Sequence, residues 1–153
     1  MKKLLVIALA IGALSSCKKS DNASAQLEVT AANIAGVYKL TADVDVKNGV
    51  TFDRFNGGTN GGVSYPSDYE TCEKDDTYTF TAAGNLTTAE GATSCTPPTS
   101  PVSFSYTVNT AAKTISILGQ VATVKSLTTS TMVVESTSTS GTATTVNTLT
   151  YSK

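Results

Sequence analysis

Apolar and polar residues alternate along most of this chain after residue 34. In the first such run, residues 38–46, every second residue is apolar, and the positions between hold Lys39, Thr41, Asp43 and Asp45. Successive side chains of a β-strand point to opposite faces, so a period of two predicts a strand with one buried face and one solvent face. We therefore expect both aspartates to face solvent.

Similar runs recur at short spacing to the end of the chain, and turn signals such as Asn48-Gly49 separate them. The further strands predicted are residues 50–55, 77–81, 86–90, 102–108, 113–118, 121–127, 131–136 and 144–151. Such a series predicts an all-β domain, an antiparallel up-and-down meander. Because an open sheet leaves unpaired edges, we expect it to close into an approximately eight-stranded barrel.

Seven large apolar or aromatic side chains are the candidates for the barrel interior. They are Tyr38, Leu40, Phe80, Phe104, Tyr106, Ile115 and Ile117. An eight-stranded barrel has room either for its own side chains or for one small ligand. The short strands favour a filled interior, and a cavity for a small apolar ligand is the alternative.

Two segments interrupt the strand pattern, residues 56–71 and residues 91–101. The first is rich in glycine over residues 56–62, and no Gly-Lys-Ser/Thr sequence follows, so it fits no phosphate-binding fingerprint. We expect a mobile surface loop. Because loops on a rigid scaffold commonly carry recognition, both segments are candidate contacts for a protein or glycan partner.

The amino-terminal segment predicts export and lipid anchoring. Two lysines precede an apolar run at residues 4–14, which is too short to span a bilayer and is typical of a cleaved signal. The following Ser15-Ser16-Cys17, preceded by a leucine, resembles the bacterial lipobox, in which cleavage precedes a cysteine that becomes lipidated. We expect a signal peptide at 1–16, a lipidated flexible tether at 17–33 with Cys17 anchored in the membrane, and a domain at 34–153.

Charge and composition narrow the function classes. Without the two signal lysines, nine basic residues stand against 12 acidic ones, a net charge of −3, and no basic cluster follows Lys18-Lys19. That pattern argues against a nucleic-acid partner. The chain has no histidine, the commonest general base and metal ligand. We therefore expect no enzyme activity, no cofactor and no metal site.

With Cys17 assigned to the lipid, Cys72 and Cys95 remain as a pair. In an exported protein an even pair predicts a disulfide, and two thiols without histidine make a poor metal site. A bridge closing this loop contributes about 3 kcal/mol by chain-entropy estimates.

Several blocks of the sequence resemble the lipocalin-like domain of Bacteroidetes lipoproteins. They are Gly36-Val37-Tyr38, the run from Cys72 to Phe80, the turn at Gly84, Cys95, the strand at 104–108, and residues 124–134. The resemblance covers roughly residues 34–153 and implies a lipocalin-like up-and-down barrel, with Tyr38 where lipocalins usually carry tryptophan. The segment Lys18-Lys19-Ser20-Asp21 resembles the short charged tag by which Bacteroidetes lipoproteins reach the outer face of the outer membrane, and a solvated linker is the alternative. We expect a location in the bacterial cell envelope, on the outer membrane, facing either the periplasm or the surface.

Two functional hypotheses follow from these observations. The first is a lipid-anchored lipoprotein whose barrel binds a small hydrophobic or amphiphilic molecule without catalysis. The second is an interaction module with a filled barrel, in which residues 56–71 and 91–101 contact a protein or glycan.

Overall fold

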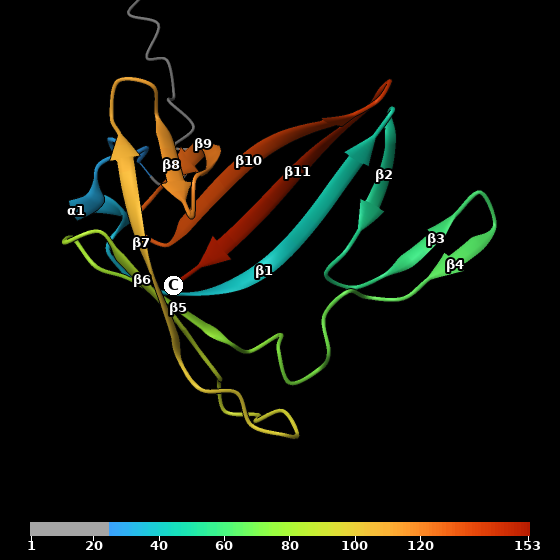
Figure 1. The fold of residues 1–153 in the computed structure, drawn as a ribbon, viewed down its shortest axis with the longest axis horizontal. Coiled ribbons are helices and arrows are strands. Elements are labelled where there is room, and N and C mark those ends of the chain that lie inside the picture. Colours follow the sequence, from blue (N-terminus) through green and yellow to red (C-terminus); the bar gives the residue numbers. More distant parts are fainter. Residues whose placement is uncertain (1–24) are drawn as a thin grey trace, which may run out of the picture.

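The structure is a computed structural model that describes residues 25–153, and it is built almost entirely from strands (Figure 1). A single helical turn, α1 (Ala31–Ile34), precedes them. The strands are β1 (Gly36–Lys47), β2 (Val50–Asp53), β3 (Gly58–Asn60), β4 (Val63–Tyr65), β5 (Thr77–Phe80), β6 (Asn85–Ala89), β7 (Val102–Asn109), β8 (Thr114–Ile117), β9 (Gln120–Leu127), β10 (Thr131–Ser140) and β11 (Ala143–Ser152).

Eight of these strands form a closed antiparallel barrel. From β5 to β11 each strand pairs with the next along the chain. β1 closes the circuit, because residues 36–39 pair with β5 and residues 39–47 pair with β11. β2 is an additional strand that pairs with the last four residues of β1, Val44 to Lys47. The predicted all-β, up-and-down, eight-stranded barrel is confirmed.

The up-and-down order gives the barrel two distinct ends. α1 and the turns at 81–84, 110–113 and 128–130 lie at one end, which we call the closed end. The 90–101 loop and the turns at 118–119 and 141–142 lie at the other, which we call the open end. The strands β1, β10 and β11 are longer than their neighbours and extend past this end (Figure 1).

The glycine-rich segment, where we expect a mobile surface loop over residues 56–71, contains a short exposed hairpin. β3 and β4 pair with each other in a separate two-stranded sheet. The turn between them is Gly61-Gly62, and both glycines have positive φ, 56° and 83°. Glycine adopts this backbone conformation without penalty, so the pair forms a tight hairpin turn.

A bulge in β1 reverses which of its faces points into the barrel. Thr41 is an extra residue on β1, because the register with β11 shifts between Leu40 and Ala42. One extra residue moves every later side chain of a strand to the opposite face. Asp43 and Asp45 consequently lie on the interior face, and the expectation that they face solvent is wrong.

Residues 25–33 pack on the barrel, which corrects the expectation that this part of 17–33 is a flexible tether. The Leu27 N–H donates to the carbonyl of Leu127 on β9 at 2.7 Å. Val29 and Ile34 are buried, and Ile34 is completely inaccessible to solvent. These apolar residues are too few to show a periodicity in the sequence. No helix among residues 25–153 is long and apolar enough to cross a membrane.

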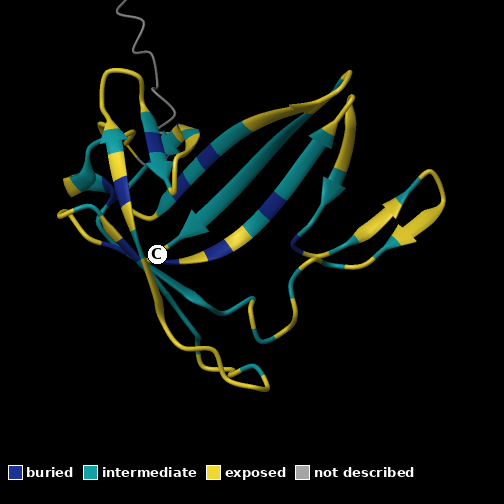
Figure 2. Ribbon diagram, viewed as in Figure 1, coloured by how far each residue is buried: buried dark blue, intermediate teal, exposed yellow. Residues whose placement is uncertain are grey.

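The closed end holds the densest part of the core. Phe80 makes edge-to-face contacts with Tyr38 and Tyr106, at centroid distances of 5.7 and 5.4 Å. The Tyr38 hydroxyl donates to the Ile34 carbonyl, and the Tyr106 hydroxyl donates to the Thr81 carbonyl. Aromatic burial is therefore combined with satisfied polar groups. Figure 2 shows buried positions on the barrel strands and a mostly exposed β3–β4 hairpin.

Candidate functional site

A cavity of about 250 Å³ lies inside the barrel, between the core at the closed end and the open end. Its wall is mostly apolar and comes from five strands, β5, β8, β9, β10 and β11. The lining residues are Phe80, Ile115, Ile117, Gln120, Val121, Ala122, Met132, Val134, Ser136, Leu149 and Tyr151. The expectation of a completely filled interior is therefore wrong, and the physical reason is that the inward residues Ala122 and Ser136 are small.

Polarity rises along the interior face of β10, β11 and β1 from the closed end to the open end. Cross-strand neighbours share a face of the sheet, so the registers of β10, β11 and β1 define successive interior rows. In order they are Met132–Tyr151–Leu40, Val134–Leu149–Asp43 and Ser136–Asn147–Asp45. The first row is largely apolar and the third is wholly polar, so this interior face is amphipathic along its length. Asp43 and Asn147 are cross-strand neighbours of residues that line the cavity, Asp45 lies in the same row as Asn147, and none of the three is itself part of the lining.

Asp43 is the centre of the polar end. It is the one charged side chain that is buried among residues 25–153, with 9% exposure. The Tyr69 hydroxyl donates to its Oδ2 at 2.7 Å, and the Asn147 amide donates to its Oδ1 at 2.6 Å. The same amide donates to Asp45 at 2.9 Å. Both partners of Asp43 are neutral donors.

Arg54 is the cation that borders this polar end. Its guanidinium forms an ion pair with Asp68 and approaches Asp45 at 3.7 Å. Its backbone N–H donates to the carbonyl of Asp43 at 2.8 Å, but its side chain forms no ion pair with that carboxylate within the described chain. The three carboxylates and one guanidinium leave the polar end with net negative charge.

Three tyrosines adjoin Asp43. Burial, followed by the hydrogen bond to Asp43, raises the pKa of Tyr69 far above its usual value. Burial also raises the pKa of Tyr78 and Tyr151, and the charge of Asp43 adds to both shifts. The Tyr78 and Tyr151 rings pack edge to face at 5.3 Å. All three phenols are consequently neutral at physiological pH.

The hydroxyl of Tyr151 differs from those of the core tyrosines. Tyr38 and Tyr106 donate to backbone carbonyls, as described above. Within residues 25–153, neither the Tyr151 nor the Tyr78 hydroxyl forms a protein hydrogen bond, and Tyr151 lines the cavity. A polar group placed in an apolar wall in this way can orient a ligand.

The seven predicted interior residues divide between core and cavity. Phe80, Ile115 and Ile117 line the cavity. Tyr38, Leu40, Phe80, Tyr106 and Ile115 are buried, and Phe104 and Ile117 are partly buried and pack against the core.

Sequence reasoning missed the contribution of β10 and β11 to the cavity. Met132, Val134, Leu149 and Tyr151 all line it. They lie two residues apart within their strands, so the period-two pattern that selected the other candidates could have found them.

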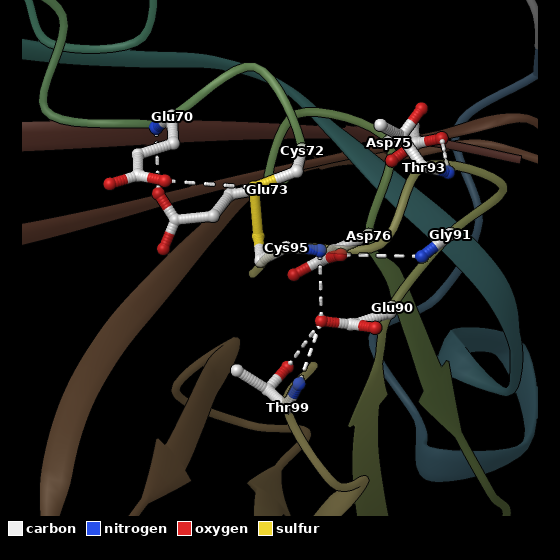
Figure 3. The surroundings of a disulfide bond; sticks show 10 residues. All are labelled: Glu70, Cys72, Glu73, Asp75, Asp76, Glu90, Gly91, Thr93, Cys95 and Thr99. Atoms are coloured by element: carbon white, nitrogen blue, oxygen red, sulfur yellow. Dashed lines mark hydrogen bonds between the residues drawn. A yellow bond between two sulfur atoms is a disulfide. The ribbon is translucent and has the colours of Figure 1, made fainter. Parts of the chain in front are cut away.

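The predicted disulfide is present at the open end and joins the segment before β5 to the 90–101 loop (Figure 3). Cys72 and Cys95 are bonded with a Cα–Cα distance of 5.2 Å. The Glu90 carboxylate accepts hydrogen bonds from the backbone N–H groups of Cys95 and Thr99, which lower the pKa of that carboxyl. The loop is therefore held by covalent and polar contacts.

Among the described residues, the one grouping of potential metal-ligating side chains is Glu70 with Cys72 and Cys95. Both sulfur atoms are bonded to each other, so neither is available as a thiolate ligand. Residues 69–72 and 93–96 also line an open depression on the surface, which places the two predicted contact loops side by side there. Cys17, the predicted lipidation site, and the predicted signal at 1–16 lie outside the described residues.

The comparison with known families agrees with this architecture. A family profile described as a lipocalin-like domain matches residues 34–134. The matched part runs from the end of α1 into β10, so it includes most of the barrel. No curated protein and no solved structure matches the chain. On the family match over about two thirds of its length, the chain belongs to the lipocalin-like domain family.

Proposed function

We propose that this protein is an exported lipoprotein, anchored by lipid on Cys17, whose barrel binds one small hydrophobic or amphiphilic molecule without catalysing a reaction. The observation that carries the proposal is the apolar cavity of about 250 Å³, which lies above a tightly packed closed end. A concave apolar site with a few polar groups is the usual form of a small-molecule site.

The cavity volume limits the size of the ligand. It exceeds the roughly 150 Å³ of a cavity that accommodates benzene, and it lies just below the range of about 300–1,000 Å³ of drug-sized sites. A short alkyl chain or a small ring system fits such a volume. Burying about 200 Å² of apolar ligand surface contributes about 5 kcal/mol, which corresponds to a dissociation constant on the order of 0.2 mM before polar contacts.

A fluorescence titration with a matched pair of variants tests the binding proposal. The neutral dye N-phenyl-1-naphthylamine brightens in apolar surroundings, and octanol should displace it from the wild-type protein. Ala122→Phe fills the cavity and should abolish dye binding, whereas Thr123→Phe, on the exposed face of the same strand, should leave it intact. Circular dichroism checks that both variants fold. Dye binding that survives Ala122→Phe places the site elsewhere, and no binding of dye or octanol to the wild type at millimolar concentration ends the proposal.

Anchoring and location belong to the same proposal and rest on the amino-terminal sequence. We infer that cleavage before Cys17 produces a multiply acylated cysteine, because one acyl chain gives only marginal membrane binding and two or more hold a protein stably. The inferred location is the outer membrane of a bacterial envelope. Metabolic labelling with a fatty-acid analogue should mark the wild type and not Cys17→Ala, and membrane fractionation should release the variant. Labelling that survives the substitution contradicts this anchoring.

Non-catalytic binding is part of the same proposal. The polar end contains carboxylates, an arginine and neutral tyrosines, and the chain supplies no histidine as a general base. The proposed ligand should therefore be recovered unchanged after incubation with the protein, as measured by mass spectrometry. Time-dependent conversion of a bound ligand would contradict this part.

A further inference from the structure

We infer that the preferred ligand is a cationic amphiphile, with its apolar part in the cavity and its ammonium group at Asp43 and Asp45. This inference rests on the proposed function. It adds the chemical class of the ligand and the direction in which the ligand lies.

The first argument is that Asp43 is buried without a cation. A buried carboxylate is ordinarily paired with a positive charge, because removing an isolated charge from water is costly. Within residues 25–153, Asp43 accepts hydrogen bonds from Tyr69 and Asn147, both neutral, and forms no ion pair. The guanidinium of Arg54 pairs with Asp68 and approaches Asp45 at 3.7 Å, so it forms no ion pair with Asp43. A cation that enters from the cavity supplies the missing counter-charge.

The second argument is the sign of the surrounding charges. The cavity lining contains no charged residue, so the nearest charges decide the field inside it. The charges acting on the Tyr78 hydroxyl are those of Asp76, Glu73 and Asp43, all carboxylates, and Asp43 acts on Tyr151 as well. Beyond Asp45 on this face of β1, the next charged residue is Lys47, at the exposed strand end. Arg54 borders this end as well, and its guanidinium is paired with Asp68 and close to Asp45. Because carboxylates outnumber this cation, the field beside the cavity favours a positive group.

The third argument is the aromatic character of the same end. Tyr69 is hydrogen-bonded to Asp43, and the Tyr78 and Tyr151 rings pack together within reach of its charge. Ammonium groups bind favourably against aromatic faces, and more so where water is excluded. The unpartnered Tyr151 hydroxyl on the cavity wall adds a polar contact beside the apolar chain.

The row order fixes which end of the ligand lies where. The row of Met132, Tyr151 and Leu40 adjoins the closed core, and the row of Ser136, Asn147 and Asp45 lies toward the open end. An alkyl chain directed inward leaves its head group level with Asp43 and Asp45. A carboxylate head in the same position meets like charge, so a fatty acid is the disfavoured member of such a series.

A matched series of octyl ligands tests the inference. Octylamine, octanol and octanoate share one chain length and differ in head-group charge at pH 7 and low salt. Each should displace N-phenyl-1-naphthylamine from the wild type. Octylamine should bind about tenfold more tightly than octanol, and octanoate about tenfold more weakly. The preference should fall as salt is raised, because screening weakens charge interactions.

Substitutions test which carboxylates cause the preference for octylamine over octanol. Asp43→Asn and Asp45→Asn keep side-chain size, and each should reduce the ratio of octylamine affinity to octanol affinity several-fold. Glu28→Gln, which removes an exposed carboxylate in the segment at the closed end, is the matched control and should retain the ratio. If Asp43→Asn fails to fold, Asp45→Asn alone decides.

The outcomes separate this inference from the proposed function. Octanol binding without a preference for octylamine overturns the inference and leaves the barrel a binder. A preference that survives in Asp45→Asn and in a folded Asp43→Asn overturns the assigned position. Absence of binding by every member of the series overturns the proposed function itself.

Discussion

The two ends of the barrel are built from the same strands, but side chains fill the closed end completely and leave a cavity toward the open end. At the closed end, Tyr38 and Ile34 have exposures of 1% and 0%, and the Tyr38 hydroxyl is satisfied by a backbone carbonyl. Toward the open end the strands surround a cavity, and the carboxylates of Asp43 and Asp45 occupy interior positions. The residues that stabilise the fold and the residues proposed to bind a ligand therefore lie at different positions along the barrel axis. Substitutions at the closed end should mainly lower the free energy of unfolding, and substitutions toward the open end should mainly change ligand affinity.

The largest expected effect comes from removing an aromatic ring at the closed end. Tyr38→Ala should lower the free energy of unfolding by about 3–5 kcal/mol, because it empties a fully packed site. Leu149→Ala, on the cavity wall, should cost only about 1–2 kcal/mol, because its side chain already borders empty space. Urea denaturation measures both values. Equal losses at the two sites would remove the distinction between a packed and an unpacked end.

The next effect concerns the covalent link at the open end. The double substitution Cys72→Ser and Cys95→Ser should lower the free energy of unfolding by about 3 kcal/mol, because the unfolded chain gains conformational freedom. Urea denaturation of the wild type with and without reductant gives an independent value. Since the bond holds loops and not the cavity wall, octanol affinity in the folded variant should remain unchanged. A loss of affinity with intact folding would show that the loops shape the cavity.

Alkaline pH should destabilise the protein through its buried tyrosines. Burial raises the folded-state pKa of Tyr38, Tyr106, Tyr78 and Tyr151 above the unfolded value near 10. The folded state then holds more protons than the unfolded state, so their contribution is intact below pH 10 and is lost as pH rises above it. Between its unfolded and its folded pKa, each such tyrosine should cost up to about 1.4 kcal/mol per pH unit.

Urea midpoints between pH 8 and pH 11 measure this loss. In Tyr151→Phe, the urea midpoint should fall less steeply with rising pH, because one of the ionising tyrosines has been removed. An unchanged slope would mean that the Tyr151 hydroxyl ionises in the folded protein, which would contradict a dry cavity wall.

The smallest effect concerns the segment that covers the closed end. The Thr30 hydroxyl accepts a hydrogen bond from the Asn33 N–H at 3.1 Å and caps α1. Thr30→Ala should cost about 1 kcal/mol, measured by urea denaturation. Thr30→Ser retains the oxygen and should cost less. If the alanine variant is as stable as the wild type, the cap contributes nothing to closing this end.

Local patterns were sufficient to predict the strands of the barrel and insufficient to predict the cavity. Alternation predicted β1, β7 and β9 within a residue or two, because each strand's pattern is carried by its own residues. The interior position of Asp43 and Asp45 depended on a one-residue bulge at Thr41, which appears only when β1 is paired with β11. The polar residues beside the cavity could therefore not be predicted before the register between β1 and β11 was known.

The amino-terminal segment shows the same division. Leu27 and Val29 lie in a polar stretch that lacks periodicity, and their burial depends on a surface made by distant strands. The sequence predicted a mobile loop around Gly61-Gly62, and only the pairing between β3 and β4 shows that these glycines form a hairpin turn.

The order of amino acids along this chain was enough to predict an all-β meander and the pairing of Cys72 with Cys95, because period-two burial and cysteine count are local properties. Tertiary structure decided the register of β1 against β11, the seal at the closed end and the space left above it. These depend on contacts between residues more than a hundred positions apart, such as Asp43 and Asn147. No local pattern encodes which distant side chains will meet across a closing barrel.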